Sequence, residues 1–260
     1  MRQPEPSKLE ATSGLDREVS EFWTRNVNAE RIQGRAVTLA ARGTETYYGD
    51  LETQRYRSHR HLMSWITSMQ SGSSVLEVGC GVGMDSVQMA RHGLLVTALD
   101  LTVIAPATAQ RRARREHFNI EYLCANGEHL PFPDSSFDYV YSFGVMHHAP
   151  NTRRCVDEAW RVLKPGGQAL IMLYHRHSLN EVVHRILGVP FEEKHELCPV
   201  VRRYTRREIR EMFSHFRRVE VHPDFVFGEG YRAVFRLTPL PLYRLLSRWM
   251  GWHLMIRATR

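Results

Sequence analysis

Residues 75–83, VLEVGCGVG, decide the fold, because an apolar run passes there into three glycines spaced two apart and then into a helical pattern. The apolar run predicts a β-strand that is closed by an acidic residue. Glycines remove side chains where a ligand must approach the backbone and where the chain must turn tightly into a helix. The stretch therefore predicts a strand, a tight loop and a helix start that together cradle a nucleoside-bearing ligand.

The spacing of the glycines narrows the class of ligand. A dinucleotide-binding loop has the pattern G-x-G-x-x-G, which would place a glycine at position 84, but Met84 stands there and the third glycine is Gly83. The resulting pattern, E-x-G-x-G-x-G, resembles the first motif of the class I S-adenosylmethionine-dependent methyltransferases. A phosphate-binding loop and a purely structural glycine turn are the alternatives for this stretch alone.

The composition is that of an ordinary globular protein with an excess of basic residues. The chain has 260 residues, a net charge of +7 and a pI near 9.5. Clustered arginines bind nucleic acid, but the arginines here are divided between residues 111–115 and 202–218 and form no single basic stripe. Solvated helix faces are the simpler interpretation, with an anionic partner as the alternative.

Cysteine usage and the N-terminus indicate a cytoplasmic protein. The cysteines show no paired zinc spacing, so free thiols in a reducing compartment are expected; they are Cys80, Cys124, Cys155 and Cys198. The N-terminus lacks the apolar core of a signal peptide. No apolar run approaches the roughly 20 residues that span a bilayer, so we expect no transmembrane segment.

Strands and helical patterns alternate after residue 70. Strands are predicted at 75–78, 94–99, 120–124, 138–142, 168–174, 219–221 and 252–258, and helices at 84–92, 106–117, 151–163 and 205–216. The last two strands lack a simple crossover helix and can be antiparallel. The resemblance implies a doubly wound α/β fold: a seven-stranded, mostly parallel sheet in the order 3-2-1-4-5-7-6, with the last strand antiparallel and helices on both faces.

The chain divides into an N-terminal extension and the predicted methyltransferase domain. Residues 1–70 are expected to form a helical lid, with one helix capped by Asp16, an irregular stretch over 26–50 and a second helix from about Thr53 to Met69. The domain spans 71–260 and carries insertions at about 175–204 and 223–250. An amphipathic helix in the first insertion is expected to cover the core, with a membrane-surface or partner role as the alternative.

The cofactor site implied by the resemblance lies at the carboxyl ends of the strands. Asp100 ends the second strand about 20 residues beyond the glycine loop, where a carboxylate can hold a ribose diol. Residues 125–138, ANGEHLPFPDSSFD, resemble the family segment D-A-E-x-L-P-F-P-D-x-S-F-D, whose first residues edge the adenine ring. This chain departs from that segment with Asn126, an amide that can still bond adenine. The expected S-adenosyl-L-methionine ligands are Glu77, Gly79, Cys80, Gly81, Gly83, Asp100, Leu101, Asn126, Gly127, Glu128 and Ser142.

Methyl transfer needs positioning, water exclusion and, for a hydroxyl or ammonium nucleophile, a base. The candidates that fall at the same sheet edge or on the lid are His147, His148, His175 and Tyr48. The alternative for the histidine pair is that it shapes the site, because a similar G-x-L-H-H run occurs in relatives with different substrates. His59 and His61 could also face substrate, but no histidine pair is completed by a ligand set, so no metal is expected.

These residues predict an S-adenosylmethionine-dependent methyltransferase that acts on an O, N, S or C nucleophile of a small molecule. The run 142–145, SFGV, differs from the N/D-P-P-Y/F run typical of nucleobase amino methylation. Aromatic residues in the insertions mildly favour an apolar acceptor, and a nucleic-acid partner is not expected. Two alternatives stay open: an RNA-modifying methyltransferase that uses the basic surface, and a non-catalytic protein that keeps the cofactor pocket. The oligomeric state is not predicted.

Overall fold

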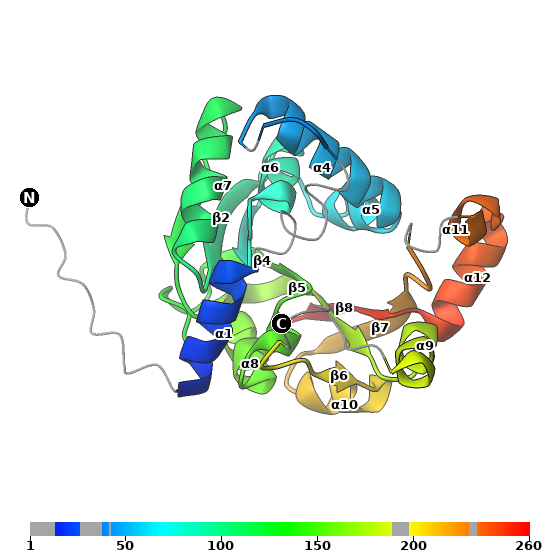
Figure 1. The fold of residues 1–260 in the computed structure, drawn as a ribbon. Helices are drawn as coiled ribbons and strands as arrows, with labels where there is room; N and C mark the ends of the chain where they lie inside the picture. The colour runs from blue at the N-terminus through cyan, green and yellow to red at the C-terminus, as the bar shows by residue number, and fades with distance from the viewer. Residues whose placement is uncertain (1–13, 27–37, 42, 189–197, 229–232) are drawn as a thin grey trace, which may run out of the picture.

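The computed structural model describes residues 14–26, 38–41, 43–188, 198–228 and 233–260. Its centre is one eight-stranded sheet (Figure 1). The strands are β1 (Ser74–Val78), β2 (Leu95–Asp100), β3 (Glu121–Cys124), β4 (Phe137–Phe143), β5 (Leu163–His175), β6 (Arg203–Tyr204), β7 (Arg218–Asp224) and β8 (His253–Thr259). Seven of them follow the order β3-β2-β1-β4-β5-β8-β7, while the two-residue β6 pairs with β5 off this path.

The predicted topology is confirmed. Without the short β6, which the sequence did not reveal, the strands follow the order 3-2-1-4-5-7-6. Strand β8 pairs antiparallel with both β5 and β7, whereas β1 to β5 pair in parallel. The parallel strands therefore end at one edge of the sheet, where ligands bind in open α/β folds.

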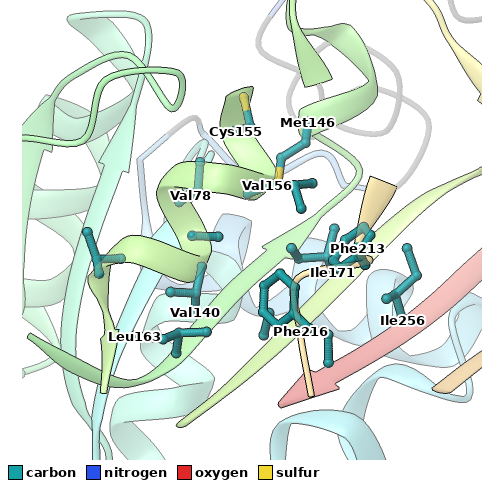
Figure 2. Close-up of a cluster of buried hydrophobic side chains, with 14 of the residues drawn as sticks. Val78, Val140, Met146, Cys155, Val156, Leu163, Ile171, Phe213, Phe216 and Ile256 are labelled. Atoms are coloured by element: carbon teal, nitrogen blue, oxygen red, sulfur yellow. The ribbon is translucent and has the colours of Figure 1, made fainter. Parts of the chain in front are cut away.

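Side chains of alternate residues in the central strands pack into two hydrophobic cores, one on each face of the sheet. In β5, Ala169 and Ile171 belong to one core and Leu170 and Met172 to the other. The first core packs under α8 (Thr152–Val162) and α10 (Arg206–Met212), as Figure 2 shows in part. The second packs under α5 (Leu62–Ile66), α6 (Met84–Arg91) and α7 (Ile104–Arg115). Helices thus cover both faces, as predicted.

The N-terminal region contains more helix than the sequence predicted. Helix α1 (Gly14–Arg25) begins before Asp16, so Asp16 lies in the first turn and is not the cap. Helix α4 (Glu45–Ser58) begins inside the stretch predicted to be irregular, because the Thr44 side chain caps it by accepting a hydrogen bond from the Tyr47 N–H.

The predicted helix over 53–69 is broken at its middle. Helix α4 ends at Ser58 and α5 begins at Leu62. The break lies at His59, whose backbone and ring nitrogens both bond the carbonyl of Arg55. The His59 ring consequently points into the wall of a cleft, and the apolar side chains after the break pack into the second core.

The described parts of the insertions carry three further helices. These are α9 (Leu179–Leu187), α11 (Ala233–Leu237) and α12 (Leu240–Met250). The predicted amphipathic helix in the first insertion is present as α9, but the prediction that its apolar face covers the core is wrong. Val182, Ile186 and Leu187 are more than half exposed, because the buried residue of this helix is Glu181 on the opposite side.

Candidate active site

A cleft of about 370 Å³ opens at the carboxyl ends of the parallel strands. Its floor is the loop after β1 and the ends of β2 and β4. Its other walls come from the N-terminal region, where α1 contributes Val19 and Trp23 and α4 contributes Arg55. The volume lies in the range of small-molecule and cofactor sites, and the location is that of ligand sites in doubly wound sheets.

Two of the three glycines are required by close packing. Gly79 has φ +85°, and a Cβ built there would lie 2.2 Å from the Val145 Cγ2. Gly83 has φ +76° and caps α6, and its Cβ would lie 2.8 Å from the Tyr122 hydroxyl. Gly81, between them, lines the cleft, and its Cβ would meet nothing within 4 Å. The loop therefore presents bare backbone to the cleft at Gly81.

Asp100 holds this loop in place. One carboxylate oxygen accepts from the Gly81 N–H at 3.1 Å, and the other accepts from the Thr102 N–H at 3.0 Å and the Thr102 hydroxyl at 2.9 Å. Burial raises the pKa of Asp100, and these hydrogen bonds oppose the shift. A carboxylate fixed beside a bare glycine loop can accept hydrogen bonds from a diol.

The segment predicted to edge an adenine ring reaches the cleft through two residues. Asn126 and Gly127 line it, and Asn126 Oδ1 accepts from the Glu128 N–H at 2.9 Å. Glu128 itself turns away to accept the Asn151 N–H at 2.7 Å, next to the start of α8. An amide at position 126 thus keeps the turn that a carboxylate would make, and its Nδ2 lies 3.5 Å from Asp16 on α1.

The remaining predicted cofactor residues fall into two groups. Glu77, Cys80 and Leu101 line the cleft, whereas Ser142 is buried and its hydroxyl donates to the Val78 carbonyl at 3.0 Å. The pKa of Glu77 is raised to about 8, chiefly by burial and also by the nearby charge of Asp85, while a hydrogen bond from the Ser86 hydroxyl opposes the shift. A neutral carboxyl group therefore stands at the cleft floor near neutral pH.

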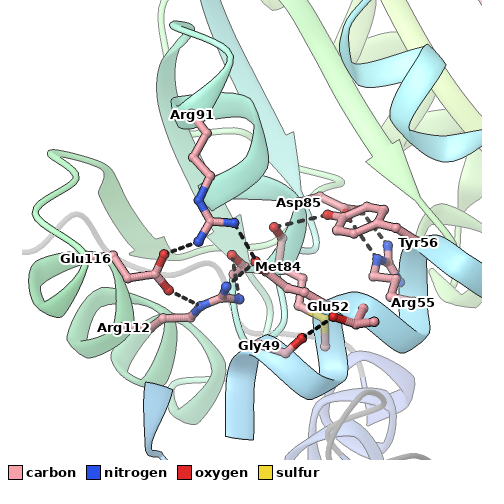
Figure 3. A network of polar contacts seen from close by, with 11 residues as sticks. Gly49, Glu52, Arg55, Tyr56, Met84, Asp85, Arg91, Arg112 and Glu116 are labelled. Carbon is pink, nitrogen blue, oxygen red and sulfur yellow. Dashed lines mark hydrogen bonds and ion pairs between the residues drawn. The ribbon is translucent and has the colours of Figure 1, made fainter. Parts of the chain in front are cut away.

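Sequence reasoning missed a buried charge network beside the loop, which Figure 3 shows. The Arg55 guanidinium forms two hydrogen bonds to Asp85, at 2.9 and 2.5 Å. Tyr56 and Tyr141 also donate to Asp85, at 2.8 and 2.9 Å. Burial alone would raise the pKa of Asp85, but the Arg55 charge and these donors lower it. Arg55 and Asp85 both line the cleft, so they offer a fixed cation and anion to a zwitterionic ligand.

Aromatic rings, among them His59 and His253, form another part of the cleft wall. His59 stacks on Phe225 at 4.7 Å between ring centroids, and His253 stacks on Phe225 at 4.5 Å. Phe143 and Tyr174 line the same part of the cleft. Burial lowers the pKa of His59 to about 3 and that of His253 well below its ordinary value, so both rings are neutral at pH 7. This wall suits a flat, uncharged ring.

One predicted base faces the cleft. His148 lines it, and its Nδ1 lies 2.8 Å from the Val200 carbonyl, which places the proton of a neutral ring on Nδ1. The Nε2 of that tautomer carries the lone pair that a base needs. Trp23 of α1 packs edge-on against the His148 ring at 4.8 Å.

The other three candidates lie outside the cleft lining. His147 is fully buried against Tyr174, at 3.8 Å between ring centroids, and burial lowers its pKa well below the ordinary value. The Nδ1 of His175 lies 2.9 Å from the Gly251 carbonyl. Tyr48 belongs to a separate apolar cluster under α4. Within the described residues, no group of three His, Cys, Asp or Glu side chains is arranged to hold a metal ion.

Comparisons with known proteins agree with this architecture. A family model described as a methyltransferase domain matches residues 76–171. The ubiquinone biosynthesis O-methyltransferase of Coxiella burnetii is 29% identical over 120 residues, 46% of this chain and 51% of that protein. The demethylmenaquinone methyltransferase of Tropheryma whipplei is 37% identical over 101 residues, 39% of this chain and 41% of that protein. The chain thus spans about half the length of the curated relatives it matches.

A solved structure extends the likeness over most of the chain. It is an S-adenosylmethionine-dependent methyltransferase from Thermotoga maritima, a possible histamine N-methyltransferase, with a TM-score of 0.60 and 16% identity. The match covers 82% of this chain and 95% of that one. A match at 16% sequence identity shows a similar fold and no more. Residues 76–171 thus match the model of a methyltransferase domain, and the chain has the fold of a solved S-adenosylmethionine-dependent methyltransferase.

Proposed function

We propose that the chain transfers a methyl group from S-adenosylmethionine to a flat, apolar small molecule. The observation that carries the proposal is a single cleft that holds the bare backbone at Gly81, the fixed carboxylate of Asp100 and a set of neutral rings. The first two are groups for a nucleoside, and the rings offer apolar surface, with the Arg55 guanidinium 5.2 Å from the centre of the Phe143 ring.

The residues of the cleft fit the cofactor's parts in turn. Asp100 suits the ribose diol, and Asn126 and Gly127 suit the adenine edge. Arg55 suits the carboxylate of the amino-acid end, and Asp85 beside it balances a positive charge. When bound, S-adenosylmethionine supplies a methyl group on a positively charged sulfur, and the transfer removes that charge.

The chain's own part in such a reaction is to orient the acceptor, exclude water and take a proton. His148 is the proposed proton acceptor, because its Nδ1 bond to Val200 presents Nε2 in the form that accepts a proton. Trp23 and Val19 of α1 lie over the same end of the cleft and reduce access of solvent.

The ring wall supports an aromatic or quinone-like acceptor. Two of the relatives are named for ubiquinone biosynthesis and for demethylmenaquinone. His59 and His253, which line the cleft and stack on Phe225, can hold such a ring by its face, while their neutral imidazoles offer hydrogen bonds to its oxygens. The atom methylated is proposed to be a phenolic oxygen, the nucleophile for which a histidine base is most useful.

The test is an acceptor screen with methyl-labelled S-adenosylmethionine and a panel of catechols, phenols, amines and thiols. The expected result is transfer to a phenolic oxygen, with kcat reduced by about a hundredfold in His148→Gln, the usual contribution of a general base. His175→Gln is the matched control, since it removes a histidine that does not line the cleft. Turnover that is unchanged in His148→Gln would contradict the assigned base, and failure to bind the cofactor would overturn the proposal.

A further inference from the structure

The apolar side chains that remain exposed gather on α9, α11 and α12. Among the described residues, large apolar side chains at least one-third exposed on these helices are Val182, Ile186, Leu187, Val234, Leu237, Leu240, Leu242, Leu245, Trp249 and Met250. The others are scattered over the rest of the chain: Leu15, Leu39, Leu95, Val103 and Ile104. Single exposed apolar residues are ordinary, but a gathering on neighbouring helices marks an interaction surface.

Helix α12 divides into three faces. Tyr243 and Ser247, four residues apart, are buried. Leu242, Leu245 and Trp249 form an exposed stripe at the i, i+3, i+7 spacing. The third face of the helix is basic.

That basic edge consists of Arg244 and Arg248, which are four residues apart and exposed. Helix α11 adds Arg236, and neither α11 nor α12 contains an aspartate or a glutamate. The carboxylate whose charge reaches Arg244 and Arg248 is Asp224, which is largely buried at the end of β7. The exposed edge is therefore positive.

The three helices are held in position by a small core of their own. Val226, Phe227, Phe235 and Tyr243 are buried together, with Leu179 of α9 and Leu246 of α12 packed against them. The Tyr243 hydroxyl donates to the Phe227 carbonyl at 3.1 Å, and the Val226 N–H donates to the Ser247 hydroxyl at 3.2 Å. Figure 1 shows α11 and α12 beyond β7, with α9 between β6 and α12. The apolar stripe thus faces outward on a fixed helix.

We propose that α12, with α9 and α11, forms a surface that binds an anionic lipid bilayer. A helix lying in the membrane interface sinks its apolar stripe among the acyl chains, keeps arginines at the headgroups and places tryptophan at the boundary. Leu242, Leu245 and Trp249 supply the stripe, and Arg244 and Arg248 meet negative headgroups. A second copy of the chain fits less well, since a self-contact along α12 would bring like charges together.

The core under α12 is linked to the cleft wall through one residue. Val226 belongs to that core, and the preceding residue, Phe225, stacks on His59 and His253, which line the cleft. Arg60, next to His59, lies over the Phe235 ring at 4.4 Å. Membrane binding requires no turnover, so it can hold or fail independently of the proposed methyl transfer.

The test is co-sedimentation of the full chain with vesicles, either pure phosphatidylcholine or an equal mixture with phosphatidylglycerol. The expected result is sedimentation with the anionic vesicles that weakens as salt rises. The double variant Leu245→Ser with Trp249→Ser should lower the partition coefficient between vesicles and water about tenfold or more. It removes two large apolar side chains whose transfer from water into the bilayer favours binding. Arg244→Glu with Arg248→Glu should remove the preference for anionic vesicles.

Matched controls change the same chemistry on another face. Leu95→Ser with Val103→Ser removes two exposed apolar residues, and Arg111→Glu with Arg114→Glu reverses two charges on α7. Both controls should bind vesicles like the unchanged chain, and circular dichroism should show all variants folded. The proposal is overturned if anionic vesicles do not bind the chain, if the controls lose binding equally, or if Leu245→Ser with Trp249→Ser abolishes a dimer seen by sedimentation velocity.

Discussion

At the scale of single residues, Asp100 has two roles in one carboxylate. It fixes the glycine loop through Gly81 and is placed to accept a ribose diol. Asp100→Ala is expected to weaken S-adenosylmethionine binding by about tenfold or more, since hydrogen bonds to a charged group are each worth about 1.5–3 kcal/mol. Titration calorimetry measures this, with the exposed Asp134→Ala as control. Equal affinity in Asp100→Ala and the unchanged chain would refute the role at the ribose.

Glu77 makes the stability of the chain depend on pH. Its pKa is about 8 in the folded chain against an ordinary 4.5, chiefly because of burial, so the folded state holds the proton more tightly than the unfolded state. Protonation of Glu77 therefore stabilises the folded chain relative to the unfolded one. This stabilisation is complete below about pH 4.5 and is lost as the pH rises through about 8. Glu77→Gln should flatten the dependence of Tm on pH over this window. A parallel pair of Tm curves for the two proteins would show that Glu77 is not responsible.

Several residues at the cleft could be predicted because their signal is local. The spacing of Gly79, Gly81 and Gly83 and the position of Asp100 at a strand end need only the sequence nearby. The Arg55–Asp85 pair could not be predicted in this way, because its two members lie 30 residues apart and neither carries a motif. His253 was missed for a similar reason: a strand that reverses direction brings it back to the cleft from the far end of the chain.

At the scale of elements, capping decides where helices begin. Thr205 and Glu208 form a reciprocal capping box at the start of α10. Thr205→Ala should lower the free energy of unfolding by about 1 kcal/mol. Thr53→Ala, in the middle of α4, should instead leave it unchanged or slightly higher, because alanine favours helix interiors. Urea denaturation of both variants checks this, and equal loss in the two would contradict the role of the cap.

The helices of the N-terminal region show why element boundaries were the weakest part of the prediction. Helix α4 has apolar residues on no single clear face, because Arg55 and Glu52 on it are committed to buried ion pairs. A periodicity search for apolar residues therefore misplaces its start. The core strands of the sheet are apolar on both faces, so their positions followed directly from composition.

Two arginines of α6 and α7 are used in ion pairs within the molecule. Arg112 is buried and bonds both Glu52 and Glu116, and Arg91 bonds the same two carboxylates, which ties α4 to α6 and α7 (Figure 3). The basic segment at 111–115 is therefore partly structural. This arrangement offers no continuous stripe for an RNA backbone on α7 and favours a small-molecule acceptor.

At the scale of the whole molecule, the N-terminal region is proposed to close over the cleft. Helix α1 reaches it through Trp23 against His148 and through Asp16 near Asn126. Addition of S-adenosylhomocysteine, the product of the cofactor, should slow tryptic cleavage after Arg17 and Arg25, which are exposed in the structure. Cleavage after the distant Arg207 should proceed at the same rate. Mass spectrometry of the fragments measures both, and identical protection at all three sites would argue against local closure.

No helix within the described ranges has both the length and the apolar character to cross a membrane. The proposed lipid contact at α12 therefore concerns a helix lying in the interface plane. Because Phe225 links that region to the ring wall, an apolar acceptor dissolved in a bilayer would lie near the cleft of a bound protein.

The neutral carboxyl at the floor of the cleft also affects calorimetry. A cofactor that brings an ammonium and a sulfonium group near Glu77 favours the ionised form of that residue, so binding near neutral pH would expel a proton into the medium. The apparent enthalpy would then change with the ionisation heat of the buffer, being different in Tris and in phosphate. Glu77→Gln would bind the cofactor with the same apparent enthalpy in both buffers. For the unchanged chain, the slope of apparent enthalpy against buffer ionisation heat would give the number of protons released.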